Sequence, residues 1–285
     1  MRTYSIVFLD IDGTMLNSRH QVMPSTLNHL KKLHEEGIPI ILCSERPPAG
    51  METVAGQVGV HSPMVCYNGG LIFDQNGGIL RDVGLDIQTA MEFKRFASEH
   101  FPELVVSAYL YNIWMVEDPQ LPVILREAEI SQHTPLKGSL EQAAASATHV
   151  HKLLCMGEAV RIRALQNEIM QHFPQLIAIR SKPECLEILS SQSTKRSAVQ
   201  MLLEQYALDA EKAIAFGDSD ADIELLKFCG LGVAMENAPK EVKNAADYVT
   251  ASNDEEGVYI ALNGLRLKAP GGRSARKARK ISFSL

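Results

Sequence analysis

The sequence has few cysteine and aromatic residues and no long apolar run. Its five cysteines are scattered and odd in number, which excludes the paired spacing of zinc sites and complete disulfide pairing. No apolar stretch approaches the roughly 20 residues of a membrane helix. The first apolar run, residues 5–9, is interrupted at Asp10, unlike the core of a signal peptide. We therefore expect a soluble, cytoplasmic protein from a reducing compartment.

Charge is unevenly distributed along the 285 residues, which carry 28 Lys and Arg against 34 Asp and Glu. Residues 266–285 include seven basic side chains and no acidic one, so the rest of the chain is more acidic than the net charge of −6 suggests. Nucleic-acid backbones bind basic surfaces. We expect residues 266–285 to form a basic, flexible tail, and we expect no nucleic-acid or membrane partner.

Apolar runs and helical periodicities alternate in the first and last thirds of the chain. Continuous apolar runs typical of strands buried on both faces occur at residues 5–9, 38–43, 64–67, 213–216 and 231–234. Leucines at helical spacing after Pro24, and the pattern over residues 195–206 and 221–228, predict intervening helices. Strands separated in this way form right-handed crossovers and a parallel sheet. The fold class is therefore α/β.

The middle of the chain has a different pattern. From about residue 85 to 184, predicted helices (86–99 and 158–172) lie among strands with more alternation (112–117 and 149–155). The length also exceeds what one hydrophobic core usually serves. We expect an α+β domain inserted into a sheet-forming domain that is built from both ends of the chain.

Carboxylates follow two of the predicted strands at the point where each strand ends. Asp10 and Asp12 follow the first strand, and Asp218 and Asp222 follow the strand at 213–216. The carboxyl ends of parallel strands meet at one edge of the sheet, where ligands bind. Four carboxylates at that edge repel one another unless a hard divalent cation lies among them, and oxygen-only donors favour Mg²⁺. The pattern predicts a Mg²⁺ site beside a substrate phosphate.

Two further residues offer donors to a phosphate. Ser44 follows the second strand, and Lys195 opens a helix after a polar run. Each has a purely structural alternative, since a serine at a helix start is commonly an N-cap and a lysine a solvated surface charge. Together with the aspartates, in this order along the chain, they favour phosphate binding.

These motifs resemble those of the haloacid dehalogenase-like (HAD) phosphatases. The run from Asp10 to Thr14 (Asp-Ile-Asp-Gly-Thr) resembles the first motif of that superfamily, and the run from Gly217 to Asp222 resembles the fourth. Residues 231–239, 246–250 and 256–258, and the Asn-Gly-Gly at 68–70, resemble the Cof-type subfamily. The resemblance spans nearly residues 1–265. It implies a Rossmann-like parallel-sheet core (1–83 and 185–265) with an inserted α+β cap domain of type IIB (84–184).

The resemblance also implies a role for each matching residue. Asp10 is expected as the nucleophile that forms an aspartyl-phosphate, and Asp12 as the acid that protonates the leaving alcohol and then activates water. Mg²⁺ is expected to be held by the Asp10 carboxylate, the Asp12 backbone carbonyl and Asp218, with Asp222 binding it through water or orienting the other ligands. The residues expected to contact phosphate are Ser44, Lys195, Gly13 and Thr14, and those expected near the substrate are Asn68, Arg46 and Asn237.

Three positions depart from the family pattern. Glu45 and Arg196 stand where the family usually has glycine, and Ala221 where it usually has asparagine. One hypothesis is that Glu45 faces away from the site and pairs with Arg46 or Arg196, and the alternative is a tolerated surface substitution. For Tyr109, Trp114 and other aromatic residues of the cap, packing is favoured over stacking on a substrate ring.

The predicted function is Mg²⁺-dependent hydrolysis of a small phosphorylated metabolite, such as a sugar phosphate or a flavin- or pyridoxal-type phosphate. The alternatives are a phosphosugar mutase of related fold and a catalytically weakened phosphometabolite-binding protein. The expected assembly is a monomer or a homodimer.

Overall fold

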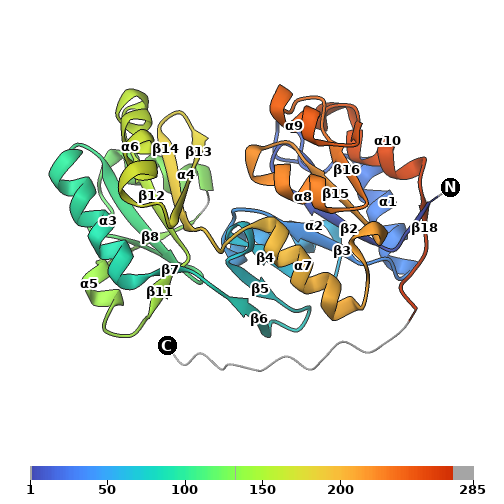
Figure 1. Cartoon of the computed structure of the whole chain (residues 1–285), viewed down its shortest axis with the longest axis horizontal. Helices are drawn as coiled ribbons and strands as arrows, with labels where there is room; N and C mark the ends of the chain where they lie inside the picture. The colour runs from blue at the N-terminus through green and yellow to red at the C-terminus, as the bar shows by residue number, and fades with distance from the viewer. Residues whose placement is uncertain (1, 132, 272–285) are drawn as a thin grey trace. The chain divides into compact units, whose positions relative to one another are not determined.

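The structure, a computed structural model, describes residues 2–131 and 133–271. The described residues divide into two compact units, one formed by residues 2–82 together with 194–271, the other by those between 83 and 193 (Figure 1). No helix among the described residues is long and apolar enough to cross a membrane.

The first unit is built on an eight-stranded sheet. In spatial order its strands are β17 (Tyr248–Val249), β16 (Leu231–Ala234), β15 (Ala213–Gly217), β2 (Ile6–Asp10), β3 (Ile40–Cys43), β4 (Met64–Cys66), β5 (Leu71–Phe73) and β6 (Ile79–Asp82). The pairs from β17 to β4 are parallel, and β5 and β6 are added antiparallel. Because β2 lies between β3 and β15, the two ends of the chain form one continuous sheet, and the α/β prediction is confirmed.

Helices cover this sheet. Those of the first unit are α1 (Pro24–Glu35), α2 (Pro48–Val58), α7 (Lys195–Tyr206), α8 (Ile223–Phe228), α9 (Lys240–Ala245) and α10 (Gly257–Asn263). Apolar side chains of α7, α8 and α9 pack with Phe8, Ile41 and Ala215 into one buried cluster. The helix α1 contacts α2, α10 and β3, and these three helices lie against the other face (Figure 1). The helix α2 was not predicted, although Pro48 is well placed at its first turn.

The second unit has a six-stranded sheet, and an apolar cluster on one face of this sheet packs against three of the unit's helices. Its strands in spatial order are β10 (Pro135–Lys137), β9 (Ile113–Val116), β8 (Val105–Leu110), β12 (Lys152–Met156), β14 (Cys185–Ser190) and β13 (Leu176–Lys182). A separate pair joins β7 (Leu85–Asp86) and β11 (His149–Val150). The helices are α3 (Ile87–His100), α4 (Pro122–Ser131), α5 (Leu140–Ala143) and α6 (Ala159–His172). Phe93 of α3 and Leu165 of α6 pack with alternate residues of β12 and β14, such as Leu153 and Ile188.

The structure corrects the expected start of the second core segment at residue 185. The strand β14 pairs with β12 and β13 of the second unit, and its Leu186 and Ile188 are buried in that unit's apolar cluster. The first unit resumes only at Thr194. The expected tail also differs at its start, because β18 (Arg266–Leu267) pairs with β1 (Thr3–Tyr4). Residues 272–285 of that tail lie outside the described residues.

A distant carboxylate caps the helix α1. Its N-cap residue, Met23, has no side chain that can accept a hydrogen bond from the first turn. Instead Glu256 accepts hydrogen bonds from the backbone N–H groups of Ser25 and Thr26, at 3.3 and 2.9 Å. A negative charge at a helix N-terminus satisfies free N–H groups and complements the helix dipole.

We expect Glu256→Ala to lower the free energy of unfolding by about 1 kcal/mol, because it removes this cap. Thermal unfolding followed by far-UV circular dichroism would then show a melting temperature lower by about 2–4 °C. Glu36→Ala at the other end of the same helix is the control, since its exposed ion pair with Lys32 contributes little. Equal melting temperatures for the two variants would contradict the capping role.

Candidate active site

Three aspartates of the first unit converge at the carboxyl edge of its sheet. Asp10 is the last residue of β2, Asp218 directly follows β15, and Asp222 lies in the short 3₁₀ turn that precedes α8. One carboxylate oxygen from each lies within 4.8 Å of the others, so that a single cation could contact all three. The predicted convergence of these residues is therefore present in the structure.

Lys195 lies among these carboxylates. It is the first residue of α7 and is buried, and its Nζ donates to Asp10 Oδ1 at 2.5 Å and to Asp222 Oδ1 at 2.7 Å. Thr194, the N-cap of α7, accepts a hydrogen bond from the backbone N–H of Ser197 and so fixes where the helix begins. An ammonium group has three donors, and these two bonds leave one available to a ligand.

Asp222 is held more tightly than the other two aspartates. Its Oδ2 accepts hydrogen bonds from the backbone N–H groups of Asp218 and Ser219, at 3.2 and 3.0 Å, and from the Ser219 hydroxyl at 2.8 Å. With Lys195 on Oδ1, both of its oxygens are engaged. Asp222 is thus suited to orienting Lys195 and the Asp218 loop. Sequence reasoning missed Ser219, although a serine three residues before an acidic residue is a recognisable capping-box pattern.

The cluster carries more negative than positive charge. Burial raises the pKa of Asp10 well above its usual range, and the nearby Asp222 and Asp218 add to this although Lys195 opposes it. Burial also raises the pKa of Asp218 to about 6. Burial alone would lower the pKa of Lys195, but the surrounding carboxylates more than offset this and raise it well above its usual value.

The chemistry of this cluster fits a divalent cation. One ammonium group among three carboxylates leaves two negative charges in excess. The donors available are oxygens only, which suits a hard ion of the Mg²⁺ type. Asp10 and Asp218 are the natural ligands, because Asp222 accepts the most hydrogen bonds of the three aspartates.

Gly13 and Thr14, which were expected to contact phosphate, pack against Asp218. The Thr14 hydroxyl donates to Asp218 Oδ1 at 2.7 Å. Gly13 has a φ of +78°, and a Cβ at this position would lie 2.2 Å from Asp218 Oδ2. Only glycine therefore allows this loop to approach the carboxylate so closely. Asn237 supports the same loop, since its Nδ2 donates to the Gly13 carbonyl at 2.8 Å.

Asp12 lies outside the three-aspartate cluster. Its two oxygens each accept a hydrogen bond of 2.7 Å from Arg46, one from Nε and one from Nη2. The ion pair of Glu45 with Arg46 or Arg196, one of the two hypotheses for this position, is absent among the described residues: Arg46 binds Asp12, and Arg196 lies over the Phe228 ring. The charge of Glu45 helps to raise the pKa of Arg46, Asp10 and Lys195. The Arg46–Asp12 pair has no signature in the sequence, because the two residues are far apart in it.

Ser44 and Asn68 lie beside each other. The Ser44 side chain is buried, its carbonyl accepts from the Asn68 backbone N–H at 2.9 Å, and its hydroxyl oxygen accepts from the Arg46 N–H at 3.3 Å. Asn68 has a φ of +51°, and its Oδ1 is buried without a hydrogen-bond partner among the described residues. These contacts leave the Ser44 hydroxyl proton without an acceptor in the described part of the chain, and thus available to a phosphate oxygen.

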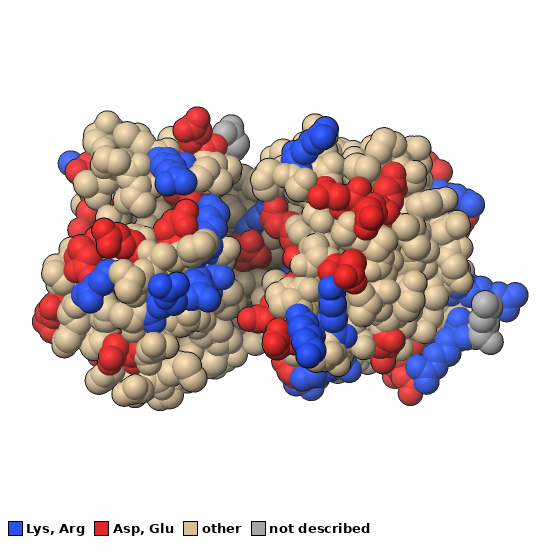
Figure 2. Space-filling view, turned by 90° about the horizontal axis from the view of Figure 1, so that it is seen from above, with Lys and Arg blue, Asp and Glu red and all other residues tan. Residues whose placement is uncertain are grey.

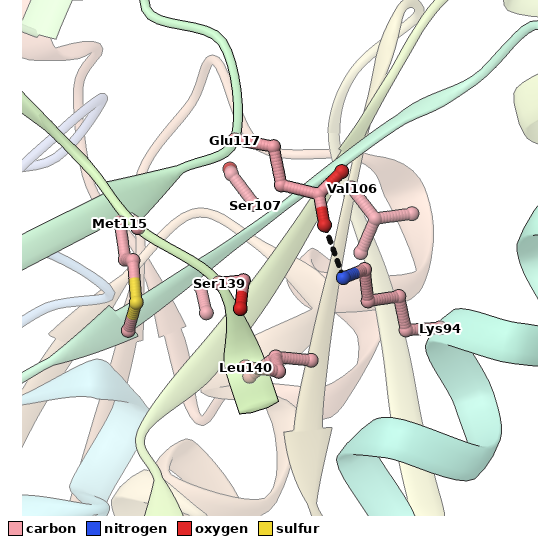
Figure 3. Close-up of a pocket in the computed structure, with 9 residues that line it drawn as sticks. Lys94, Val106, Ser107, Met115, Glu117, Ser139 and Leu140 are labelled. Atoms are coloured by element: carbon pink, nitrogen blue, oxygen red, sulfur yellow. Dashed lines mark hydrogen bonds and ion pairs between the residues drawn. The ribbon is translucent and has the colours of Figure 1, made fainter. Parts of the chain in front are cut away.

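The aromatic residues of the second unit pack against each other, as expected. The Tyr109 and Trp114 rings are stacked with centroids 5.6 Å apart, both side chains are buried, and the Trp114 Nε1 donates to Ser107. A cavity of about 10 Å³ is lined in part by Ser107. Figure 3 shows its lining side chains, among which Lys94 pairs with Glu117. A cavity of that size holds about one water molecule.

Comparison with known proteins agrees with this geometry. Residues 7–262 match the haloacid dehalogenase-like hydrolase family. A Haemophilus influenzae protein named "Putative phosphatase" is 34% identical over 259 residues, which cover 91% of this chain and 97% of that protein. The 5-amino-6-(5-phospho-D-ribitylamino)uracil phosphatase YwtE of Bacillus subtilis is 23% identical over 287 residues, covering 91% and 97%. A crystal structure of a haloacid dehalogenase-like hydrolase from Bacteroides thetaiotaomicron superposes with a TM-score of 0.82 at 28% identity, covering 92% and 99%.

The chain therefore belongs to the haloacid dehalogenase-like hydrolase family. Within it, the chain is an enzyme of the Cof-type phosphatases, as the sequence motifs indicated.

The raised pKa of Asp218 leads to a prediction about metal and pH. Its folded-state pKa of about 6 exceeds the usual 3.8, so its contribution to stability is complete below about pH 4 and is lost as the pH rises to about 6. The melting temperature of the metal-free protein, measured by differential scanning fluorimetry in the presence of a chelator, should therefore fall as the pH rises from about 4 to about 6. Mg²⁺ should restore it more at about pH 7.5 than at about pH 5, because protons compete with the metal.

The isosteric variant Asp218→Asn is the control for this experiment, and it should weaken both the pH dependence and the Mg²⁺ effect. Melting temperatures that do not respond to Mg²⁺ at either pH would exclude a metal site at this cluster.

Proposed function

We propose that the enzyme is a Mg²⁺-dependent phosphomonoesterase that transfers the phosphoryl group of a small metabolite to Asp10 and then to water. The observation that carries the proposal is the buried group of Asp10, Asp218 and Asp222 with Lys195, at the sheet edge where ligands of parallel sheets bind. Phosphoryl transfer requires mainly positioning and charge neutralisation, which these residues can supply.

The first step is attack on phosphorus by an Asp10 carboxylate oxygen. The bond from phosphorus to the ester oxygen breaks as the bond to Asp10 forms, and Asp12 gives its proton to the departing alcohol. Lys195 holds the Asp10 carboxylate through Oδ1, and its third N–H is available to a phosphoryl oxygen. The Ser44 hydroxyl supplies a second donor to the same group.

The second step releases phosphate. Asp12, now deprotonated, takes a proton from a water molecule whose oxygen attacks phosphorus, and the bond to Asp10 breaks to return its carboxylate. Asp10, the Asp12 backbone carbonyl and Asp218 would hold Mg²⁺, and Asp222 would orient them. When bound, Mg²⁺ neutralises negative charge on the phosphoryl oxygens.

The proposed substrate is a small soluble phosphate ester, such as a sugar phosphate or a flavin- or pyridoxal-type phosphate. A relative named as a 5-amino-6-(5-phospho-D-ribitylamino)uracil phosphatase supports a substrate of this size. A nucleic acid is disfavoured, since acidic and basic side chains are interspersed on the face drawn in Figure 2.

The test is hydrolysis of p-nitrophenyl phosphate and a panel of phosphorylated metabolites by purified protein with and without Mg²⁺. We expect Mg²⁺-dependent release of phosphate, and a loss of about 1000-fold or more in kcat for Asp10→Asn, which removes the nucleophile. Asp220→Asn, in the same turn as Asp222 but exposed, is the matched control and should keep full activity. A folded wild-type protein that binds phosphate esters without hydrolysing any of them would overturn the proposal and favour a phosphometabolite-binding protein.

A further inference from the structure

The carboxylate of Asp12 is fixed by one side chain. Among the described residues, Arg46 alone donates hydrogen bonds to it, through two parallel contacts of 2.7 Å. His20 approaches only to 3.7 Å and is largely exposed. The backbone around Asp12 is well held, since the Ile11 carbonyl accepts from the N–H groups of Thr14, Met15 and Leu16. The orientation of the Asp12 side chain therefore depends on Arg46.

Arg46 itself lies in a rigid segment. Its backbone N–H donates to the Ser44 hydroxyl and its carbonyl accepts from Tyr67, both at 3.3 Å. Pro47 follows it and Pro48 begins α2. A residue before proline is restricted to extended backbone, so the guanidinium extends from a chain segment with little freedom. The same segment carries Ser44, and it therefore links the predicted phosphate contact to the orientation of Asp12.

The two hydrogen bonds also have a specific geometry. A planar guanidinium that binds both oxygens of a carboxylate fixes the plane of that carboxylate as well as its position, which a lysine ammonium cannot do. These contacts leave each oxygen of Asp12 one further lone pair, in a plane that Arg46 fixes, where a proton can be lost in one step and taken up in the next. The expectation that Arg46 contacts the substrate stays a separate prediction.

We propose that Arg46 is a positioning residue, which acts through Asp12 by holding its carboxylate toward the leaving-group oxygen and then toward the attacking water. The inference rests on the proposed function, because it assigns Arg46 a part in that reaction. Arg46 forms and breaks no covalent bond. Replacing Arg46 should lower kcat most for substrates whose leaving group must be protonated as it departs.

The test uses three aryl phosphates of nearly equal size with leaving groups of increasing basicity: p-nitrophenyl, phenyl and p-methoxyphenyl phosphate. We expect Arg46→Ala to retain kcat on p-nitrophenyl phosphate within about threefold and to lose about 100-fold on p-methoxyphenyl phosphate, with little change in KM. Arg46→Lys keeps the charge but not the two parallel bonds, and it should resemble Arg46→Ala. Arg196→Ala, the matched control, removes a guanidinium that lies over Phe228 and should leave all three rates unchanged.

A double-mutant cycle separates this role from a purely structural one. In an Asp12→Asn background, Arg46→Ala should have almost no further effect on kcat, because its action passes through Asp12. Unchanged far-UV circular dichroism and melting temperature would show that the variants are folded.

Three results would overturn the inference: an equal loss on all three substrates with a raised KM, full activity of Arg46→Lys, or additive effects in the cycle. The first would assign Arg46 to substrate binding. Failure of the wild type to hydrolyse any of the three esters would instead overturn the proposed phosphatase function, and that outcome is distinguishable from the others.

Discussion

The buried ammonium group of Lys195 is the interaction on which the site depends. It joins the end of β2, the turn after β15 and the start of α7, three segments that are far apart in the sequence. Burying one cation beside three carboxylates is unfavourable unless each charge is compensated, and the site achieves only part of that compensation itself. In the proposed reaction, the remaining negative charge ties the stability of this region to the binding of a cation. The four side chains that hold these segments together are thus also those to which we assign roles in the proposed reaction.

The strand order explains how such a site is assembled from opposite ends of the chain. Pairing of β2 with β15 brings Asp10 next to the loop that carries Asp218, and pairing of β2 with β3 places Ser44 on the other side. The position of α7 also depends on close packing against a glycine. Gly69, with a φ of +104°, lies so near α7 that a Cβ would come within 2.3 Å of the Thr194 carbonyl. A side chain at residue 69 would therefore push away the start of the helix that carries Lys195.

Much of this arrangement could be predicted from the sequence, because apolar runs and helix spacing are local signals. The helix at residues 195–206 has the predicted bounds, and the strands at 213–216 and 231–234 are present with at most one residue of difference. Because ligands bind at the carboxyl ends of parallel strands, the sequence also predicts that Asp10, Asp218 and Asp222 lie close together, as they do in the structure. These features can be predicted because the spacing of apolar residues within each segment is enough to indicate them.

Other features depend on partners that no local pattern reveals. The strand Cys185–Ser190 is as apolar as a core strand, and only its pairing with β12 assigns it to the second unit. The two hydrogen bonds between Arg46 and Asp12 likewise exist only once β2 and β3 are adjacent. The parallel pairing of β1 with β18 is another contact of this kind. It holds the beginning and the end of the described chain side by side, so a short peptide linker could join them and new termini could be opened in a surface loop without changing the order of strands in the sheet.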